Sequence, residues 1–68
     1  MTRTEILKLV REKKQIQCTL AEFESHVCEY LVDIAEGAVR VNELQLATTC
    51  VQEIERLSKA LGATQKHI

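Results

Sequence analysis

The sequence predicts an all-α protein: an antiparallel helical hairpin of two helices that is completed by association with a partner chain. Three observations support this prediction. Apolar residues recur at steps of three and four along both halves of the chain, which is the period of an amphipathic helix. The 68 residues include no proline. One of the only two glycines, Gly37, lies near the middle, where it can end one helix before the next begins.

The first helix is predicted over residues 4–36. Thr2 and Glu5 have the spacing of a capping box, in which each side chain accepts a hydrogen bond from the backbone N–H of the other residue. Steps of three and four then continue as a heptad seam over four repeats. The seam consists of Ile6, Leu9, Lys13, Ile16, Leu20, Phe23, Val27, Tyr30 and Ile34.

A break in this first helix remains an alternative. Thr19 and Glu22 form a second possible capping box, which would divide the helix near residues 17–19 into a short helix and a longer one. In the unbroken version Lys13 lies within the seam, where a charge lowers stability and can fix the register or the choice of partner.

The turn is predicted over residues 37–41 and the second helix over residues 43–61. Asn42 is expected to cap the start of this helix, and Gly62 to end it. The apolar residues of the helix fall on two neighbouring seams, which together cover roughly 200°, about twice the stripe that a surface helix needs. The first seam is Leu44, Ala47, Val51, Ile54, Ser58 and Leu61, and the second is Leu46, Cys50, Leu57 and Ala60. Residues 63–68 are predicted to be a flexible tail.

This hairpin has more apolar surface than it can bury. The second helix is about 30 Å long and reaches back only to the neighbourhood of Ile16, so residues 1–15 are expected to extend beyond it. Val51 is expected to face the first helix, whereas the overhanging residues and the neighbouring seams need another cover. We therefore predict a partner-binding surface that comprises Ile6, Leu7, Leu9, Val10, Ile16, Leu31, Leu46 and Leu57.

The composition disfavours several classes of protein. Nine Lys and Arg residues balance ten Asp and Glu residues, whereas a nucleic-acid-binding domain of this size carries a clear basic excess. No apolar run approaches the roughly 20 residues of a membrane-spanning helix. The three cysteines are an odd number and no secretory leader is recognisable, which predicts a cytoplasmic protein with free thiols at Cys18, Cys28 and Cys50.

No motif predicts catalysis, a cofactor or a metal site. His26 and Cys28 are two residues apart, so on a helix their side chains point roughly 200° apart and cannot bind one ion together. His67 lies in the predicted tail, and the two glycines are too far apart for a phosphate-binding loop. We therefore predict a protein that is not an enzyme and has no small-molecule substrate.

The stretch YLVDIAEGAVRVNELQLATTCVQEIERLSKAL carries a resemblance to a known family. A helix that closes on Ala-Glu-Gly, a short crossover and a second helix containing Gln and Leu make the sequence similar to the E-type co-chaperones of type III secretion needle proteins, the YscE/PscE/EscE-like family. The resemblance implies a helical hairpin that binds a TPR-like chaperone. Through that chaperone it would help to keep the needle subunit soluble and unpolymerised in the cytoplasm.

Two other functions remain open from the residues alone. The first is a self-associating helical bundle, a homodimer that acts as a small regulatory or adaptor protein and blocks another protein's surface. The second is a nucleic-acid-binding bundle, which the balanced charge disfavours.

Overall fold

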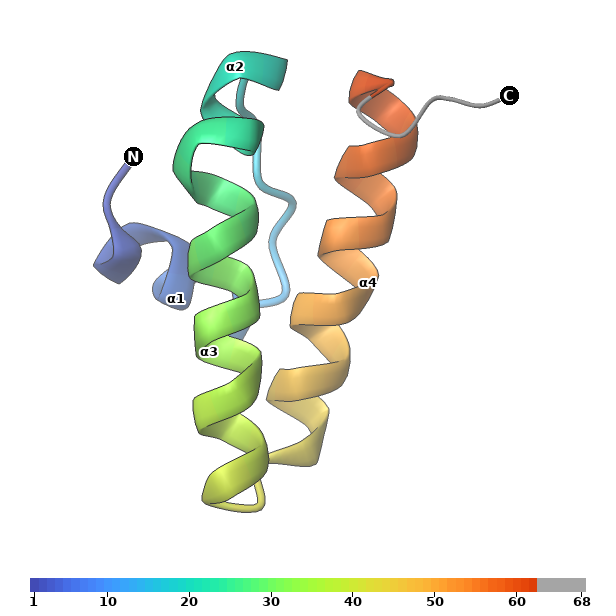
Figure 1. The fold of residues 1–68 in the computed structure, drawn as a ribbon. Coiled ribbons are helices and arrows are strands. Elements are labelled where there is room, and N and C mark those ends of the chain that lie inside the picture. The colour runs from blue at the N-terminus through green and yellow to red at the C-terminus, as the bar shows by residue number, and fades with distance from the viewer. Residues whose placement is uncertain (63–68) are drawn as a thin grey trace.

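The computed structural model describes residues 1–62, and these residues form helices joined by irregular connections (Figure 1). The predicted all-α class is confirmed for this part of the chain, which contains no strand. The elements are α1 (Arg3–Arg11), α2 (Leu20–Glu22), the π-helical turn η1 (Phe23–Val27), α3 (Cys28–Arg40) and α4 (Leu44–Leu61). Because α2, η1 and α3 follow one another without a gap, residues 20–40 form one helical rod. α3 and α4 run side by side in opposite directions.

Both predicted capping boxes are present. At the start of α1, the N–H of Glu5 donates to Oγ1 of Thr2 at 3.1 Å, and the N–H of Thr2 donates to Oε1 of Glu5 at 2.8 Å. At the start of α2, Glu22 and Thr19 exchange the same two bonds at 3.1 and 2.9 Å. Each box satisfies backbone donors that a helix start leaves open, so two separate helices begin in this half of the chain. Residues 12–19 form the linker between them.

The prediction of one continuous helix over residues 4–36 is therefore wrong. The alternative with a break is correct that a second helix begins after Thr19, but the interruption spans residues 12–19 and not only 17–19. α1 ends where Lys13 adopts the left-handed conformation, with φ of 58°. The N–H groups of Lys13 and Lys14 donate to the carbonyls of Val10 and Leu9 at 3.2 and 2.9 Å, which is the pattern of a Schellman motif. Lys13 is thus an exposed residue that ends a helix, and it is not a member of a buried seam.

The turn between α3 and α4 lies later than predicted, because α3 continues past Gly37. The left-handed residue after this helix is Asn42, with φ of 64°. The N–H groups of Asn42 and Glu43 donate to the carbonyls of Val39 and Ala38 at 3.1 and 2.7 Å, which forms a second Schellman motif. Asparagine visits the left-handed conformation more readily than most residues with a side chain, so the turn needs no glycine.

The predicted turn over residues 37–41 and the predicted N-cap at Asn42 are therefore wrong. Gly37 is an interior residue of α3, and a Cβ placed on it would meet nothing within 4 Å. The residue that precedes α4 is Glu43, and its side chain makes no capping hydrogen bond. A glycine in a helical sequence thus did not mark the end of the helix.

α4 agrees closely with the helix predicted over residues 43–61. Gly62 ends it in the left-handed conformation, with φ of 70°, and its N–H donates to the carbonyl of Ser58. The predicted tail, residues 63–68, lies outside the described residues.

One hydrophobic core joins α1, the linker and the two long helices. α1 folds back and packs against both α3 and α4, and the linker adds a buried isoleucine between them. The prediction that residues 1–15 overhang the hairpin is therefore wrong. The buried cluster consists of Ile6, Val10, Ile16, Phe23, Val27, Leu31, Ile34, Cys50 and Leu57.

Both predicted seams of α4 have members at this core: Cys50 and Leu57 of the second belong to it, and Ile54 and Leu61 of the first pack against it. Cys50 and Leu57 of the second seam are buried, whereas Leu44 and Val51 of the first are 57% and 49% exposed. The expectation that Val51 faces the first helix is wrong. An apolar surplus nevertheless remains on α4, because residues 1–62 leave the large side chains of Leu44 and Val51 exposed.

Candidate protein-binding surface

Most of the residues predicted to bind a partner lie in the core of the monomer. Ile6, Val10, Ile16, Leu31 and Leu57 are each at most 2% exposed. Leu7, Leu9 and Leu46 are half-buried and pack against the same core. That prediction rested on an uncovered N-terminal arm and on apolar seams beside the hairpin contact. The arm does not exist in the fold, and Leu31 and Leu57 of these seams are buried in the core. A partner-binding surface has to be sought among other residues.

A polar clamp on α4 holds the linker in place. Glu53 is only 9% exposed, and its Oε2 accepts a hydrogen bond from the N–H of Ile16 at 2.6 Å. Nη2 of Arg56 donates to the carbonyl of Ile16 at 2.7 Å and to Oε2 of Glu53 at 2.6 Å, while Nε donates to Oε1 at 2.9 Å. Both backbone groups of Ile16 are therefore satisfied by side chains of α4. A segment that belongs to neither a helix nor a sheet has no regular backbone partners for its N–H and C=O groups. Here the side chains of Glu53 and Arg56 take the place of those partners for Ile16.

The clamp lowers the pKa of Glu53. Burial by itself favours the neutral acid and raises the pKa, but three effects favour the carboxylate. These are the hydrogen bonds from Arg56, the N–H bond from Ile16 and the positive charge of Arg56, and together they outweigh burial. Glu53 is therefore ionised at neutral pH, as the bidentate contact with the guanidinium requires.

Two ion pairs join α1 to the hairpin at its edges. Nε of Arg3 lies 3.2 Å from Oδ2 of Asp33, and Nη1 of Arg11 lies 3.1 Å from Oε2 of Glu43. All four side chains are well exposed, so each pair contributes little, on the order of 0–1 kcal/mol. Burial of the apolar face of α1 is the larger contribution.

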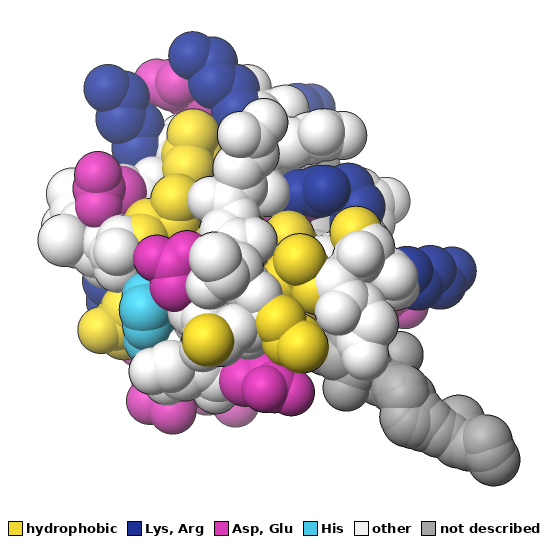
Figure 2. All heavy atoms as spheres, turned by 90° about the horizontal axis from the view of Figure 1, so that it is seen from above, with side chains coloured by type: hydrophobic (Ala, Val, Ile, Leu, Met, Phe, Trp, Pro, Cys, Tyr) yellow, Lys and Arg dark blue, Asp and Glu magenta, His cyan; other side chains and the backbone are white. Residues whose placement is uncertain are grey.

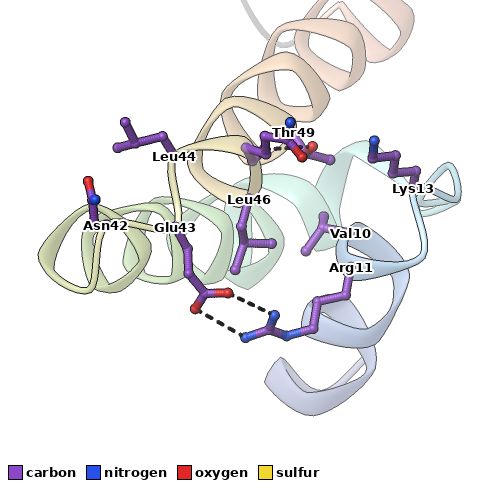
Figure 3. A pocket seen from close by; sticks show the side chains of 9 residues that line it. Val10, Arg11, Lys13, Asn42, Glu43, Leu44, Leu46 and Thr49 are labelled. Atoms are coloured by element: carbon purple, nitrogen blue, oxygen red, sulfur yellow. Dashed lines mark hydrogen bonds and ion pairs between the residues drawn. The ribbon is translucent and has the colours of Figure 1, made fainter.

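A pocket of about 390 Å³ lies beside the second of these pairs, where α1 meets the start of α4 (Figure 3). Figure 3 shows the side chains of Arg11 and Glu43 directed at each other across one side of the pocket. The guanidinium and the carboxylate neutralise each other there. The pocket thus offers a ligand no unpaired charge from this pair, and we do not assign it as a ligand site.

A second hollow lies between α3 and α4, and we call it the α3–α4 groove. Its volume is about 460 Å³, and no residue of α1 or of the linker lines it. Val39 and Val51 are 58% and 49% exposed, although both are large apolar side chains. The lining residues are Ala35, Glu36, Val39, Arg40, Ala47 and Val51.

The spacing of these residues explains the groove. Ala35 and Val39 are four residues apart on α3, as Ala47 and Val51 are on α4, so each pair lies on one face of its helix. The short alanine side chains leave a hollow between the helices, and the valines form its apolar rim. Such an open apolar face between two helices is suited to receive apolar side chains of another helix.

Two opposite charges border the groove on α3. Neither the carboxylate of Glu36 nor the guanidinium of Arg40 has a hydrogen-bond or ion-pair partner among residues 1–62. They differ in this from Asp33 on the same helix, which pairs with Arg3. Both charges are available to a molecule that enters the groove.

The cysteines show no sign of activation. Cys18, Cys28 and Cys50 are free thiols. Burial raises the pKa of Cys50, and burial together with the nearby carboxylate of Glu22 raises the pKa of Cys18. Both thiols are therefore protonated at neutral pH, whereas a reactive cysteine needs a lowered pKa. The buried Cys50 acts as a small apolar residue of the core.

His26 lies on η1 and does not form a site with its neighbours. Its Nε2 is buried and has no hydrogen-bond partner in the described part of the chain, and the centre of its ring lies 5.7 Å from that of Tyr30. Within residues 1–62, no three His, Cys, Asp or Glu side chains gather in a way that could hold a metal ion.

The sequence contained signals for the residues that its interpretation missed. Glu53 lies between Cys50 and Leu57 at the spacing of a core-facing seam, and Arg56 follows three residues later. A charged pair at such a position indicates a buried ion pair or a backbone clamp. On α3, Val39 follows Ala35 by four residues, so the two share one side of the helix beside α4. The prediction of a turn over residues 37–41 hid this spacing.

Figure 2 views the molecule from the end where α2 lies and α4 finishes. Hydrophobic side chains there form separate patches, divided by backbone and uncharged polar atoms as well as by charged side chains. No helix within residues 1–62 combines the length and the apolar character needed to cross a membrane. Comparison of the chain with known protein families, curated proteins and solved structures gives no match.

Proposed function

We propose that this protein is a non-enzymatic binding module that docks its α3–α4 groove on a partner protein. The observation that supports this proposal is the uncovered apolar face of Val39 and Val51 on a monomer whose core is otherwise complete. Apolar residues on two adjacent helices are commonly exposed together at interaction sites, whereas single exposed residues are common everywhere. The thiols that burial keeps protonated agree with a binding role rather than with a catalytic one.

The partner that we propose is a TPR-like chaperone, and the site of action is the cytoplasm. This assignment rests on the resemblance of the sequence to the E-type co-chaperones of type III secretion. A TPR-like repeat is built of paired helices, which can present the apolar helix face that the α3–α4 groove would receive. In this role the protein helps the chaperone to hold the needle subunit in a soluble, unpolymerised form.

Co-expression tests this function. The chain is produced together with a TPR-like needle chaperone and its needle subunit, and the complex is purified by size-exclusion chromatography with light scattering. We expect the wild-type chain to co-purify, and Val39→Asp to be lost from the complex because it places a charge against an apolar contact. Val41→Asp is the matched control, since Val41 is 64% exposed but does not line the groove. Failure of the wild-type chain to co-purify, or equal loss with both variants, would contradict the proposed function.

A further inference from the structure

We infer that, in the absence of another partner, a second copy of this chain occupies the α3–α4 groove and forms an antiparallel homodimer. This inference rests on the proposed function, because it uses the same docking surface. It goes further by naming the occupant and the contacts that select it. The argument comes from the arrangement of charges along α3.

Glu36 and Arg40 make the face of α3 complementary to itself. They are four residues apart, carry opposite charges, border the groove and have no partner among residues 1–62. A two-fold axis perpendicular to α3 at the level of Ala38 places the α3 helices of two copies antiparallel. Each Arg40 then lies opposite Glu36 of the other copy, so one contact is repeated twice, as isologous interfaces require.

The apolar part of the groove agrees with this arrangement. The small side chains of Ala35 and Ala47 create the hollow, and Val39 and Val51 lie at its rim. The valines of each copy therefore have room to enter the groove of the other copy. None of the α4 residues that line the groove is charged, so antiparallel packing brings no like charges together there. Two hairpins joined in this way form a four-helix bundle, with α1 and the linker of each copy on the outer side.

The size of the molecule is sufficient for such an interface. A stable interface buries roughly 800 Å² on each partner, which is less than a fifth of the 4510 Å² of accessible surface of this chain. The molecule measures 36 × 24 × 18 Å along its principal axes, so the cross-section of its broad side is of the same order as this area. Val32 and Leu44 are 43% and 57% exposed and lie seven residues before Val39 and Val51, a spacing of about two helical turns that places them near the same faces of α3 and α4.

A charge-exchange cycle on the isolated chain tests the inference. Sedimentation velocity over a range of protein concentrations gives the dissociation constant of the dimer for the wild type, Glu36→Arg, Arg40→Glu and the double variant. Each single exchange places like charges opposite each other at both symmetry-related contacts. We expect it to raise the dissociation constant by at least about tenfold. The double exchange reverses both charges and is expected to restore the wild-type value, with circular dichroism showing that all four chains are folded.

The results of this experiment can overturn the homodimer without overturning the proposed function. A monomeric wild-type chain at every concentration overturns the inference, and so does a double variant that stays as weak as the single variants. Neither result affects binding of the chaperone through the groove. A foreign partner does not reverse its own charges, so the double exchange cannot restore a complex of the chain with the chaperone. Recovery in the isolated chain therefore identifies a second copy as the occupant.

Discussion

The two long sides of the α3–α4 hairpin differ in how they are covered. On one side, α1 and the linker bury Ile6, Val10 and Ile16, and the clamp formed by Glu53 and Arg56 satisfies the backbone of the linker. On the other side, the α3–α4 groove leaves valines half exposed and two charges without partners among residues 1–62. Among residues 1–62, the buried polar network of Glu53 and Arg56 lies on the side where the chain covers its own hairpin. The closed side contributes to the stability of the monomer, and the open side is the one that we propose to associate.

The largest expected effect comes from the closed side. Ile6→Ala removes a fully buried side chain from α1 and leaves a cavity, so we expect a loss of about 2–5 kcal/mol in the free energy of unfolding. A domain of this size has a total stability of roughly 3–5 kcal/mol, so the variant is expected to be largely unfolded. Urea denaturation followed by circular dichroism measures this. A change below about 0.5 kcal/mol, the range of ordinary surface substitutions, would show that α1 is detached in solution.

The clamp makes the closed side sensitive to acid. The pKa of Glu53 is lowered in the folded protein, so its contribution to stability is present above its unfolded pKa of about 4.5 and is lost as the pH falls through the folded pKa. We expect Glu53→Gln to cost about 1–3 kcal/mol at pH 7, since Arg56 and the N–H of Ile16 lose a charged partner.

Denaturation at several pH values between 7 and 3 measures the effect of the clamp. The difference in stability between the wild type and Glu53→Gln should shrink as the pH falls below about 4.5, because the wild type then loses the same charge. Glu55→Gln, an exposed carboxylate on the same helix, is the matched control and should change stability by less than about 0.5 kcal/mol. A pH-independent difference would mean that Glu53 acts through its shape and not its charge.

A smaller effect, of opposite sign, is expected at Gly37. This residue lies inside α3 with open space around its Cβ position, so Gly37→Ala should raise the free energy of unfolding by roughly 0.5–1 kcal/mol. Gly62→Ala is the control and should lower it, because Gly62 has a φ of 70°. Thermal unfolding of both variants distinguishes the two glycines. Destabilisation by Gly37→Ala would restore the interpretation of Gly37 as part of a turn.

From the sequence, several helix ends were predicted correctly, whereas the faces by which the helices pack against one another were not. The capping boxes at Thr2 and Thr19 and the final residue Gly62 were predicted because these signals depend on a few adjacent residues. The ends of α1 and α3 were missed because Lys13 and Asn42 take the left-handed conformation that glycine usually provides. A Schellman motif is made by backbone hydrogen bonds. When its left-handed residue is not glycine, the sequence gives little indication of it.

The position of the candidate site could not be predicted from periodicity alone. Both seams of α4 were recognised, and their apolar surplus correctly indicated more surface than one hairpin buries. Which seam faces inward depends on where α1 packs, and this contact joins residues far apart in the sequence. Periodicity therefore predicts Val51 in the core and Ile6 at the interface, whereas in the fold Ile6 is fully buried and Val51 is 49% exposed.

The central claim is that the α3–α4 groove associates while the opposite side of the hairpin holds the monomer together. Val51→Asp and Ile6→Asp test it directly when thermal unfolding by circular dichroism is combined with light scattering on the same samples. We predict that Val51→Asp retains its helicity and unfolds within a few degrees of the wild type, which corresponds to less than about 1 kcal/mol, but no longer associates. Ile6→Asp, which buries an unpaired carboxylate, should be unfolded. Equal loss of helicity in both variants, or undiminished association of Val51→Asp, would contradict the account.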